Sequence, residues 1–208
     1  MGLLQLQDIS CEKQDRVLFA NLSLTLAKGE LLFLKGENGA GKTSLLRIMV
    51  GLSKPQRGKV YFDGVDLTED MSVCEKLIYC GHKLGLNASL NPVENLMFWS
   101  NTHGHNASLT ELEDILEQLG LFGMEDLPLR QLSAGQQRRV SLAKLWINTH
   151  AKLWVLDEPF TALDKQTVEL LENKLDSFVE SGGSVVLTSH QQASLNCKQR
   201  EWILEYLH

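Results

Sequence analysis

The chain lacks any hydrophobic run long enough to cross a membrane. Its 208 residues are 43% hydrophobic, but no apolar stretch approaches the roughly 20 residues that a spanning helix requires. The first six residues also lack the basic segment and the continuous apolar core of a signal peptide. We therefore expect any membrane role to depend on partner subunits.

The chain has few cysteines, and its basic side chains are fewer than its acidic ones. The four cysteines form neither a Cys-x-x-Cys pair nor a cluster with histidine, which favours free thiols over a disulfide framework or a zinc site. The formal net charge is −6, from 26 acidic and 20 basic side chains. This balance argues against a protein that coats nucleic acid, so we expect no nucleic-acid partner.

The length favours a single domain, which need not be stapled by disulfides or metal. Apolar patterns typical of strands occur at residues 22–26, 31–34, 59–62, 153–156 and 184–188. A helix with one apolar face separates the last two strands. Strand–helix alternation of this kind predicts a parallel sheet that is covered on both faces.

The middle of the chain is predicted to be helical. Asn91 and the Pro92 that follows it are typical of a helix start. Ser133 is a second candidate cap, for a helix running to Ile147. Between these two helices, one apolar face and a stop at Gly120 predict another helix; its face is formed by Leu109, Leu112, Leu116 and Leu119.

A glycine-rich segment carries the first chemical signal. Residues 36–43 fit the pattern G-x-x-x-x-G-K-[ST], follow an apolar strand and open a helix. Small residues let successive backbone N–H groups turn inward around phosphates, next to the positive end of the helix. We expect Lys42 to reach the β- and γ-phosphates of a nucleotide and Thr43 to bind Mg²⁺. The expected nucleotide-binding residues here are Gly36, Glu37, Asn38, Gly39, Ala40, Gly41, Lys42, Thr43 and Ser44.

Two acidic residues follow the apolar strand at 153–156. Asp157 and Glu158 stand at its carboxyl end, which is where ligands bind in α/β sheets. Asp157 is expected to hold Mg²⁺, and Glu158 to orient or deprotonate the attacking water. His190 ends the next apolar strand at the same edge, where a lone histidine is more often structural than catalytic.

A third motif points to a family. The segment Leu132-Ser133-Ala134-Gly135-Gln136 resembles the signature loop of ABC-transporter ATPases, with Ala134 where glycine is commoner. The phosphate loop, this loop, the acidic pair, Ala162-Leu163-Asp164 and His190 follow in the family's order over nearly the whole chain. The resemblance implies an α/β fold of the P-loop NTPase, ABC ATPase type, with a mostly parallel central sheet, an antiparallel β subdomain and an inserted helical subdomain. It divides the single domain 1–208 into a nucleotide-binding core, 1–84 and 146–208, and a helical insert, 85–145.

The resemblance also implies a head-to-tail homodimer that binds two ATP at its interface. Each ATP would contact the phosphate loop of one chain and the signature loop of the other. The residues implied outside the phosphate loop are Ser133, Gly135, Gln136 and Asp164 for binding, Asp157 with Thr43 for Mg²⁺, and Glu158, His190 and His82 for catalysis.

Two departures from the family pattern stand out. The aromatic residue that usually stacks on adenine is absent, and Cys11 and Glu12 occupy that region. Phe19 is the nearest aromatic, and we expect it to pack in the core. His82 stands where the family usually has a glutamine that senses Mg²⁺ and links to the transmembrane partner. A haem-ligand role for His82 is disfavoured because no second ligand motif lies at a suitable spacing.

Segments outside the nucleotide site narrow the resemblance. Tyr79-Cys80-Gly81-His82 and the run at 153–164 are similar to the ATP-binding subunits of bacterial haem exporters used in cytochrome c maturation. That resemblance implies a peripheral subunit on the cytoplasmic face of the inner membrane. Its partners would be the transmembrane protein CcmB, with CcmC, CcmD and the haem chaperone CcmE.

Three other functions stay open at this point. The same ATPase could serve a different cargo, such as a lipid, a lipoprotein or a small molecule, because nothing in an ATP site reads cargo. A soluble mechanoenzyme acting on DNA or ribosomes is disfavoured, since no sustained heptads lie between Lys42 and Ser133. A nucleotide sensor without hydrolysis is disfavoured by Glu158, Asp164 and His190.

Overall fold

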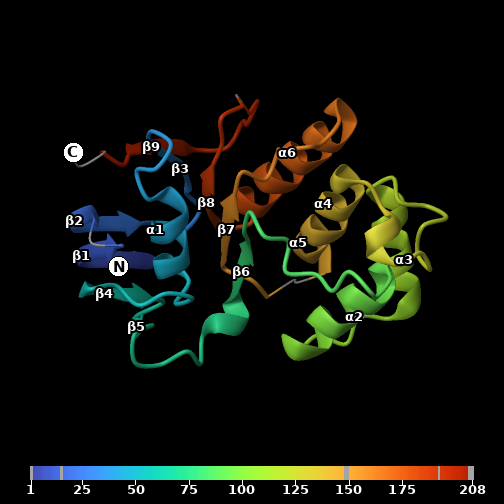
Figure 1. The fold of residues 1–208 in the computed structure, drawn as a ribbon, viewed down its shortest axis with the longest axis horizontal. Coiled ribbons are helices and arrows are strands. Elements are labelled where there is room, and N and C mark those ends of the chain that lie inside the picture. Colours follow the sequence, from blue (N-terminus) through green and yellow to red (C-terminus); the bar gives the residue numbers. More distant parts are fainter. Residues whose placement is uncertain (1, 15, 148–149, 192, 206–208) are drawn as a thin grey trace.

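The chain folds around two sheets and a separate group of helices (Figure 1). The computed structural model describes residues 2–14, 16–147, 150–191 and 193–205. The antiparallel sheet has the strand order β2-β1-β4-β5, and the parallel sheet has the order β6-β7-β8-β3-β9. The strands are β1 Leu4–Lys13, β2 Arg16–Leu26, β3 Leu31–Lys35, β4 Arg57–Phe62, β5 Val65–Asp66, β6 Leu77–Cys80, β7 Leu153–Asp157, β8 Ser184–Thr188 and β9 Gln199–Ile203.

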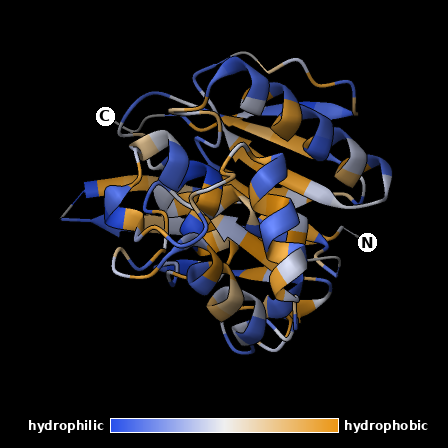
Figure 2. Cartoon of the chain, turned by 90° about the vertical axis from the view of Figure 1, so that its right-hand side faces the viewer, coloured by the Kyte–Doolittle hydropathy of each residue, from blue (hydrophilic) through white to orange (hydrophobic). Residues whose placement is uncertain are grey.

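The central strands of the parallel sheet are apolar because both of their faces are buried. In β3, Leu32 and Leu34 pack into one hydrophobic cluster, while Leu31 and Phe33 pack into another on the opposite face. Such continuous apolar runs are typical of parallel strands with helices on both sides. Figure 2 shows hydrophobic residues gathered on the inner strands, with hydrophilic residues on the outer helix surfaces.

Different elements pack against the two faces of the parallel sheet. Helix α1 (Lys42–Met49) and the antiparallel sheet share one hydrophobic cluster with the sheet. Helix α6 (Lys165–Glu180) packs into the cluster on the other face. This arrangement of a parallel sheet, an antiparallel sheet and helices confirms the predicted fold class.

Four further helices lie between β6 and β7 in the sequence and have a hydrophobic cluster of their own. At the start of this group, the Asn91 side chain accepts a hydrogen bond from the Glu94 N–H, and Glu94 reciprocates at the Asn91 N–H, as a capping box predicts. The helices are α2 Pro92–Thr102, α3 Leu109–Gln118, α4 Ala134–Leu142 and α5 Lys144–Ile147, with the short 3₁₀ turn η2 Leu129–Gln131 before α4; another 3₁₀ turn, η1 Cys74–Lys76, precedes β6. No helix in the described part of the chain is long and apolar enough to cross a membrane.

Three details differ from the sequence patterns. Leu109 is 52% exposed because it is the first residue of α3, and Ile115 takes its place in the buried face. The helix predicted from Ser133 to Ile147 is divided into α4 and α5 at Ala143, which keeps right-handed helical angles. No pattern predicts β9, an edge strand whose side chains are mostly exposed.

Candidate functional site

Three neighbouring strands bring the predicted chemistry to one edge of the parallel sheet. The phosphate loop follows β3, Asp157 and Glu158 stand at the end of β7, and His190 follows β8, which lies between these strands. A cavity of about 350 Å³ opens there. It is lined by Lys13, Leu18, Asn38, Gly39, Gly41, Lys42, Thr43, Ser44, Asp157, Glu158 and His190.

Glycine is required at the start of α1. Gly41 has φ +98° and occupies the N-cap position without any side-chain cap, so the first-turn N–H groups stay available to a ligand. A Cβ at this position would lie 3.1 Å from the Phe19 ring. Phe19 is only 1% exposed, so it packs in the core beneath the phosphate loop, as predicted.

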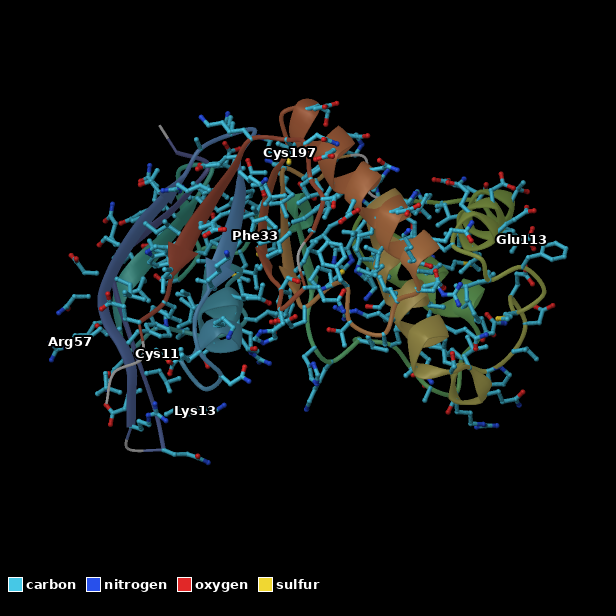
Figure 3. The ribbon with its side chains drawn as sticks, turned by 90° about the horizontal axis from the view of Figure 1, so that it is seen from above. Cys11, Lys13, Phe33, Arg57, Glu113 and Cys197 are labelled. Carbon is cyan, nitrogen blue, oxygen red and sulfur yellow. The ribbon has the colours of Figure 1, made fainter. Side chains whose placement is uncertain are left out.

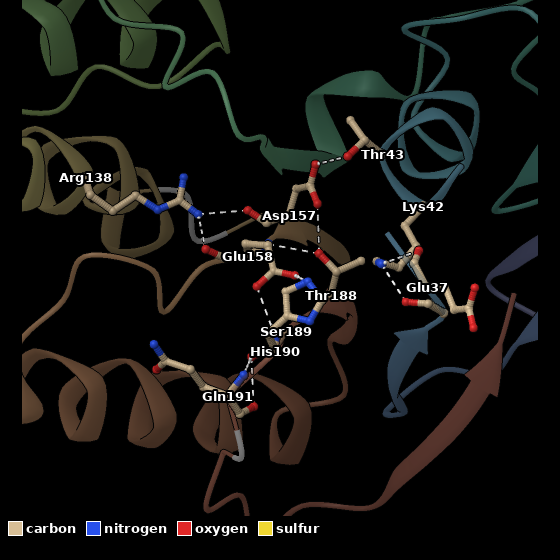
Figure 4. A network of polar contacts seen from close by, with 11 residues as sticks. Glu37, Lys42, Thr43, Arg138, Asp157, Glu158, Thr188, Ser189, His190 and Gln191 are labelled. Atoms are coloured by element: carbon tan, nitrogen blue, oxygen red, sulfur yellow. Dashed lines mark hydrogen bonds and ion pairs between the residues drawn. The ribbon is translucent and has the colours of Figure 1, made fainter. Parts of the chain in front are cut away.

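Lys42 lies across the phosphate loop. Its Nζ donates hydrogen bonds to the Gly36 carbonyl at 2.7 Å and to the Glu37 carbonyl at 3.1 Å (Figure 4). These bonds hold the ammonium group over the loop that the sequence motif assigns to phosphates. The positive charge is therefore already placed beside the first-turn N–H groups of α1.

Asp157 is joined to two threonines. The Thr43 hydroxyl donates to Asp157 Oδ2 at 2.7 Å, and the Thr188 hydroxyl donates to Oδ1 at 2.8 Å. The Asp157 residue is only 3% exposed. Carboxylate and hydroxyl oxygens are hard ligands that suit Mg²⁺, which usually takes one or two protein ligands together with phosphate oxygens and water. The residues present therefore fit this ion, and no group of three or more acidic, histidine or cysteine ligands occurs in the described ranges.

Glu158 has an unusual backbone conformation and a side-chain oxygen without a hydrogen bond. Its φ is +51°, a left-handed conformation that L-residues rarely adopt. Its Oε2 accepts a hydrogen bond from the His190 N–H at 3.2 Å, while its Oε1 is buried without a hydrogen-bond partner. The His190 Nε2 lies 3.5 Å from that Oε1. The carboxylate is thus held at the cavity with Oε1 next to the His190 imidazole but without a hydrogen bond.

Arg138 is a residue of this edge that no motif assigned to the chemistry. It lies on α4, is 5% exposed, and extends to the end of β7 (Figure 4). Its Nη2 donates to the carbonyls of Asp157 at 2.9 Å and Glu158 at 2.7 Å, and its Nη1 donates to the Gly81 carbonyl at 2.9 Å. Burial lowers the pKa of the guanidinium from its ordinary value. The sequence signal was its place in the helix that follows the signature loop.

The signature-loop residues do not line this cavity in the single chain. Ser133 caps α4 by accepting the Gln136 N–H, and Gln136 accepts the Ser133 N–H in return. A Cβ on Gly135 would lie 2.6 Å from the Ala162 carbonyl oxygen, so only glycine fits there. Asp164 caps α6 through Thr167, whose hydrogen bonds lower the pKa of the Asp164 carboxyl.

His82 also lies outside the cavity lining, and it is exposed. Its neighbour Gly81 holds the carbonyl that Arg138 contacts. The lining of the cavity includes Lys13 and Leu18 and, among the described residues, no Phe, Tyr or Trp. Figure 3 shows Lys13 beyond Cys11, at the far end of the long antiparallel strands.

A second, larger groove of about 490 Å³ runs beside α6 and includes Trp146, Trp154, Lys174 and Phe178. None of the described residues that line it is acidic, and none belongs to the phosphate loop. The residues that the sequence motifs predict for phosphate and Mg²⁺ line the smaller cavity instead.

The fold and this edge of the sheet define an ATP-binding cassette. Residues 19–161 match the family model of the ABC transporter. A solved dimeric cassette in a post-hydrolysis state, bound to ADP and phosphate, has a TM-score of 0.80 and 25% identity over 90% of this chain and 88% of that one. A dimeric bacterial ABC transporter cassette at 23% identity shares the fold, with a TM-score of 0.82 over 99% of this chain and 97% of that one. The chain therefore belongs to the ABC transporter family and is an ATPase of that type.

Curated relatives indicate which kind of ABC transporter protein the chain resembles. The cytochrome c biogenesis ATP-binding export protein CcmA of Histophilus somni is 45% identical over 204 residues, which is 98% of this chain and 94% of the relative. The protein of the same name from Escherichia coli is 46% identical over 192 residues, covering 92% of this chain and 90% of the relative. These similarities confirm the resemblance predicted from the sequence.

Proposed function

We propose that this chain is the ATP-hydrolysing subunit of a haem exporter for cytochrome c biogenesis. It would bind the transmembrane subunit CcmB at the cytoplasmic face of the bacterial inner membrane, with CcmC and CcmD, and its ATPase cycle would release the haem-loaded chaperone CcmE. The observation that carries the ATPase part is the convergence of Lys42, Asp157, Glu158 and His190 on one cavity. The similarity to CcmA proteins supports the export part.

In this proposal the phosphate loop binds ATP through backbone N–H groups and Lys42. Phosphate oxygens would replace the carbonyls of Gly36 and Glu37 as partners of the Lys42 ammonium group. Thr43 and Asp157 would hold Mg²⁺, which neutralises charge on the phosphates when it is bound. The hydrogen bond between Thr43 and Asp157 would keep both ligands in place before the nucleotide arrives.

Hydrolysis is assigned to Glu158. Its Oε1, which makes no hydrogen bond within the chain, would accept a hydrogen bond or a proton from the attacking water. The His190 backbone N–H holds the other oxygen, and the imidazole next to Oε1 steadies the carboxylate. In this assignment Glu158 is the base that positions the water, and His190 orients the Glu158 carboxylate.

A second copy of the chain completes the site in this proposal. Ser133, Gly135 and Gln136 lie at the start of α4, where the first-turn N–H groups that the capping box does not occupy would suit phosphate oxygens of ATP held by the partner. Asp164 would lie at the same interface. His82 would act only in the assembled complex, since it lies outside the cavity of one chain. The helical insert 85–145 would carry the signature loop, and 1–84 with 146–208 would form the core.

Purification of the complex from its native membrane tests the proposal. Mass spectrometry should identify a CcmB-type membrane subunit, the absorption spectrum should show haem, and phosphate release should require both ATP and Mg²⁺. A membrane partner of another transporter type without haem would overturn the haem-exporter part and leave the ATPase part standing. Absence of Mg²⁺-dependent ATP hydrolysis would overturn the mechanism.

A further inference from the structure

We propose that Arg138 is a positioning residue for ATP hydrolysis, whose guanidinium group holds the Asp157–Glu158 backbone in the conformation that aims the Glu158 carboxylate. The inference rests on the proposed role of Glu158 and deepens it. It assigns a function in the active site to a side chain that comes from the signature helix α4.

The first observation is the choice of partners that Arg138 makes. A buried guanidinium is costly unless its donors are satisfied. The Arg138 hydrogen bonds all go to backbone carbonyls, those of Gly81, Asp157 and Glu158 at 2.7–2.9 Å and that of Pro159 at 3.5 Å. The guanidinium group therefore holds the main chain around Glu158, and the carboxylates of Asp157 and Glu158 stay available for other partners.

The second observation is the conformation at the point of contact. Along an extended strand, successive carbonyls point to opposite sides. The carbonyls of Asp157 and Glu158 instead converge on the same Arg138 nitrogen. This convergence coincides with the left-handed φ of +51° at Glu158, which a non-glycine residue keeps only where its surroundings enforce it.

The third observation is that Glu158 is held at both its backbone N–H and its backbone carbonyl. Its N–H donates to the Thr188 hydroxyl at 2.9 Å, and its carbonyl accepts from Arg138 (Figure 4). Thr188 is itself fixed to Asp157, and the His190 N–H fixes Oε2. Arg138 is the member of this set that comes from outside the strand edge, and its loss would free the Glu158 carbonyl.

The test compares Arg138→Met and Arg138→Lys in the native membrane complex, with Arg200→Met as the control. Arg200, on β9, also donates to a backbone carbonyl, that of Thr25 at 2.7 Å, and pairs with Glu30, away from Glu158. We expect Arg138→Met to lower kcat at least tenfold while KM for Mg·ATP stays within threefold. Arg138→Lys should lower kcat at least threefold, because one ammonium group cannot span the carbonyls that the planar guanidinium reaches. Arg200→Met should keep kcat within twofold.

A combination with Glu158→Gln separates positioning from general structural damage. In single-turnover hydrolysis, adding Arg138→Met to Glu158→Gln should slow the reaction by less than threefold, because the residue through which Arg138 acts is already disabled. Losses that multiply would overturn the proposal, as would a folded Arg138→Met with kcat within threefold of wild type. Equal losses for Arg138→Met and Arg200→Met would do the same. If Arg138→Met does not fold, a wild-type kcat for Arg138→Lys overturns it. An inactive wild type would instead refute the proposed function.

Discussion

Glu158 combines two energetically unfavourable features. Its left-handed φ and its buried Oε1 without a hydrogen-bond partner are both unfavourable, and strain of the first kind costs about 1–3 kcal/mol. Contacts from Thr188, Arg138 and His190 maintain the arrangement. Such concentrated strain is typical of a site in which geometry serves the reaction.

Replacement of Glu158 should separate hydrolysis from binding. Glu158→Gln keeps the shape of the side chain but removes its capacity to accept a proton, so we expect steady-state hydrolysis to fall at least about 100-fold. ATP affinity should stay within about threefold, because the phosphate loop is unchanged. Phosphate release and nucleotide filter binding measure the two effects, and a variant that turns over within tenfold of wild type would remove Glu158 from this role.

Lys42 should behave in the opposite way. A charged hydrogen bond contributes about 1.5–3 kcal/mol, so Lys42→Ala should weaken ATP binding by roughly 10-fold to 150-fold. Lys35→Ala is the matched control, because Lys35 stands at the end of β3, is exposed and pairs with Glu201. Titration calorimetry with Mg·ATP measures both, and an equal effect of the two substitutions would contradict the phosphate-contact role.

Base selectivity should be loose. Stacking on an aromatic ring contributes about 1–3 kcal/mol per base. The described cavity lining includes Leu18 and Lys13 but no Phe, Tyr or Trp. Phe19 is buried beneath Gly41 and is unavailable. We therefore expect GTP to compete with ATP within about fivefold in an inhibition assay. A preference for ATP above a hundredfold would show that another contact reads the base.

At the scale of elements, sequence patterns predict what local physics decides. The apolar runs of β3, β7 and β8 follow from burial of both faces, and the caps Asn91 and Ser133 follow from hydrogen bonding within one turn. The phosphate loop and the acidic pair could be predicted because their spacing is local. The edge strand β9 could not, because its exposed residues follow no apolar alternation. The contacts of Arg138 also could not, since they depend on how α4 approaches two strands far away in the sequence.

Strands β4 and β5 carry a pH-dependent contact. Asp66 accepts a hydrogen bond from Lys59 Nζ at 2.8 Å and others from Thr68, which lower the pKa of the Asp66 carboxyl to about 2. A lowered pKa means that the ionised form stabilises the fold above the ordinary aspartate pKa of about 3.9. This contribution is lost as the pH falls through about 2.

Asp66→Asn should therefore destabilise the protein near neutral pH and do so less at lower pH. Urea unfolding from pH 6 down to pH 3 measures the difference in unfolding free energy between wild type and variant, which should shrink as the pH falls below about 4. Glu69→Gln is a suitable comparison, because Glu69 contacts the same Lys59 at 3.1 Å but is 72% exposed. A difference for Asp66→Asn that does not change with pH would contradict the ionic contribution.

At the scale of the whole molecule, a single chain holds only part of the proposed site. The cavity contains the phosphate loop and the catalytic residues, whereas Ser133 and Gln136 lie at the start of α4 outside its lining. The start of a helix binds anions well, through its positive dipole end and the first-turn N–H groups that its cap leaves unoccupied. A symmetric pair of chains would let each α4 meet the phosphates held by the other, which closes the assembly at two copies. ATP would then be the ligand that stabilises the dimer.

Substitution of Ser133 tests this assembly without disturbing the helix. Aspartate and asparagine cap helices about as well as serine, so Ser133→Asp and Ser133→Asn should both preserve α4. They differ in charge, and a carboxylate facing the γ-phosphate of the partner's ATP would repel it. In the Glu158→Gln background, where ATP is not consumed, we expect light scattering to show an ATP-dependent dimer with Ser133→Asn. With Ser133→Asp the midpoint should move to at least tenfold higher protein concentration. ATP affinity of the monomer should be equal in the two variants, because Ser133 lies outside its own cavity. Equal dimerisation of the two variants would show that α4 does not meet the partner's nucleotide.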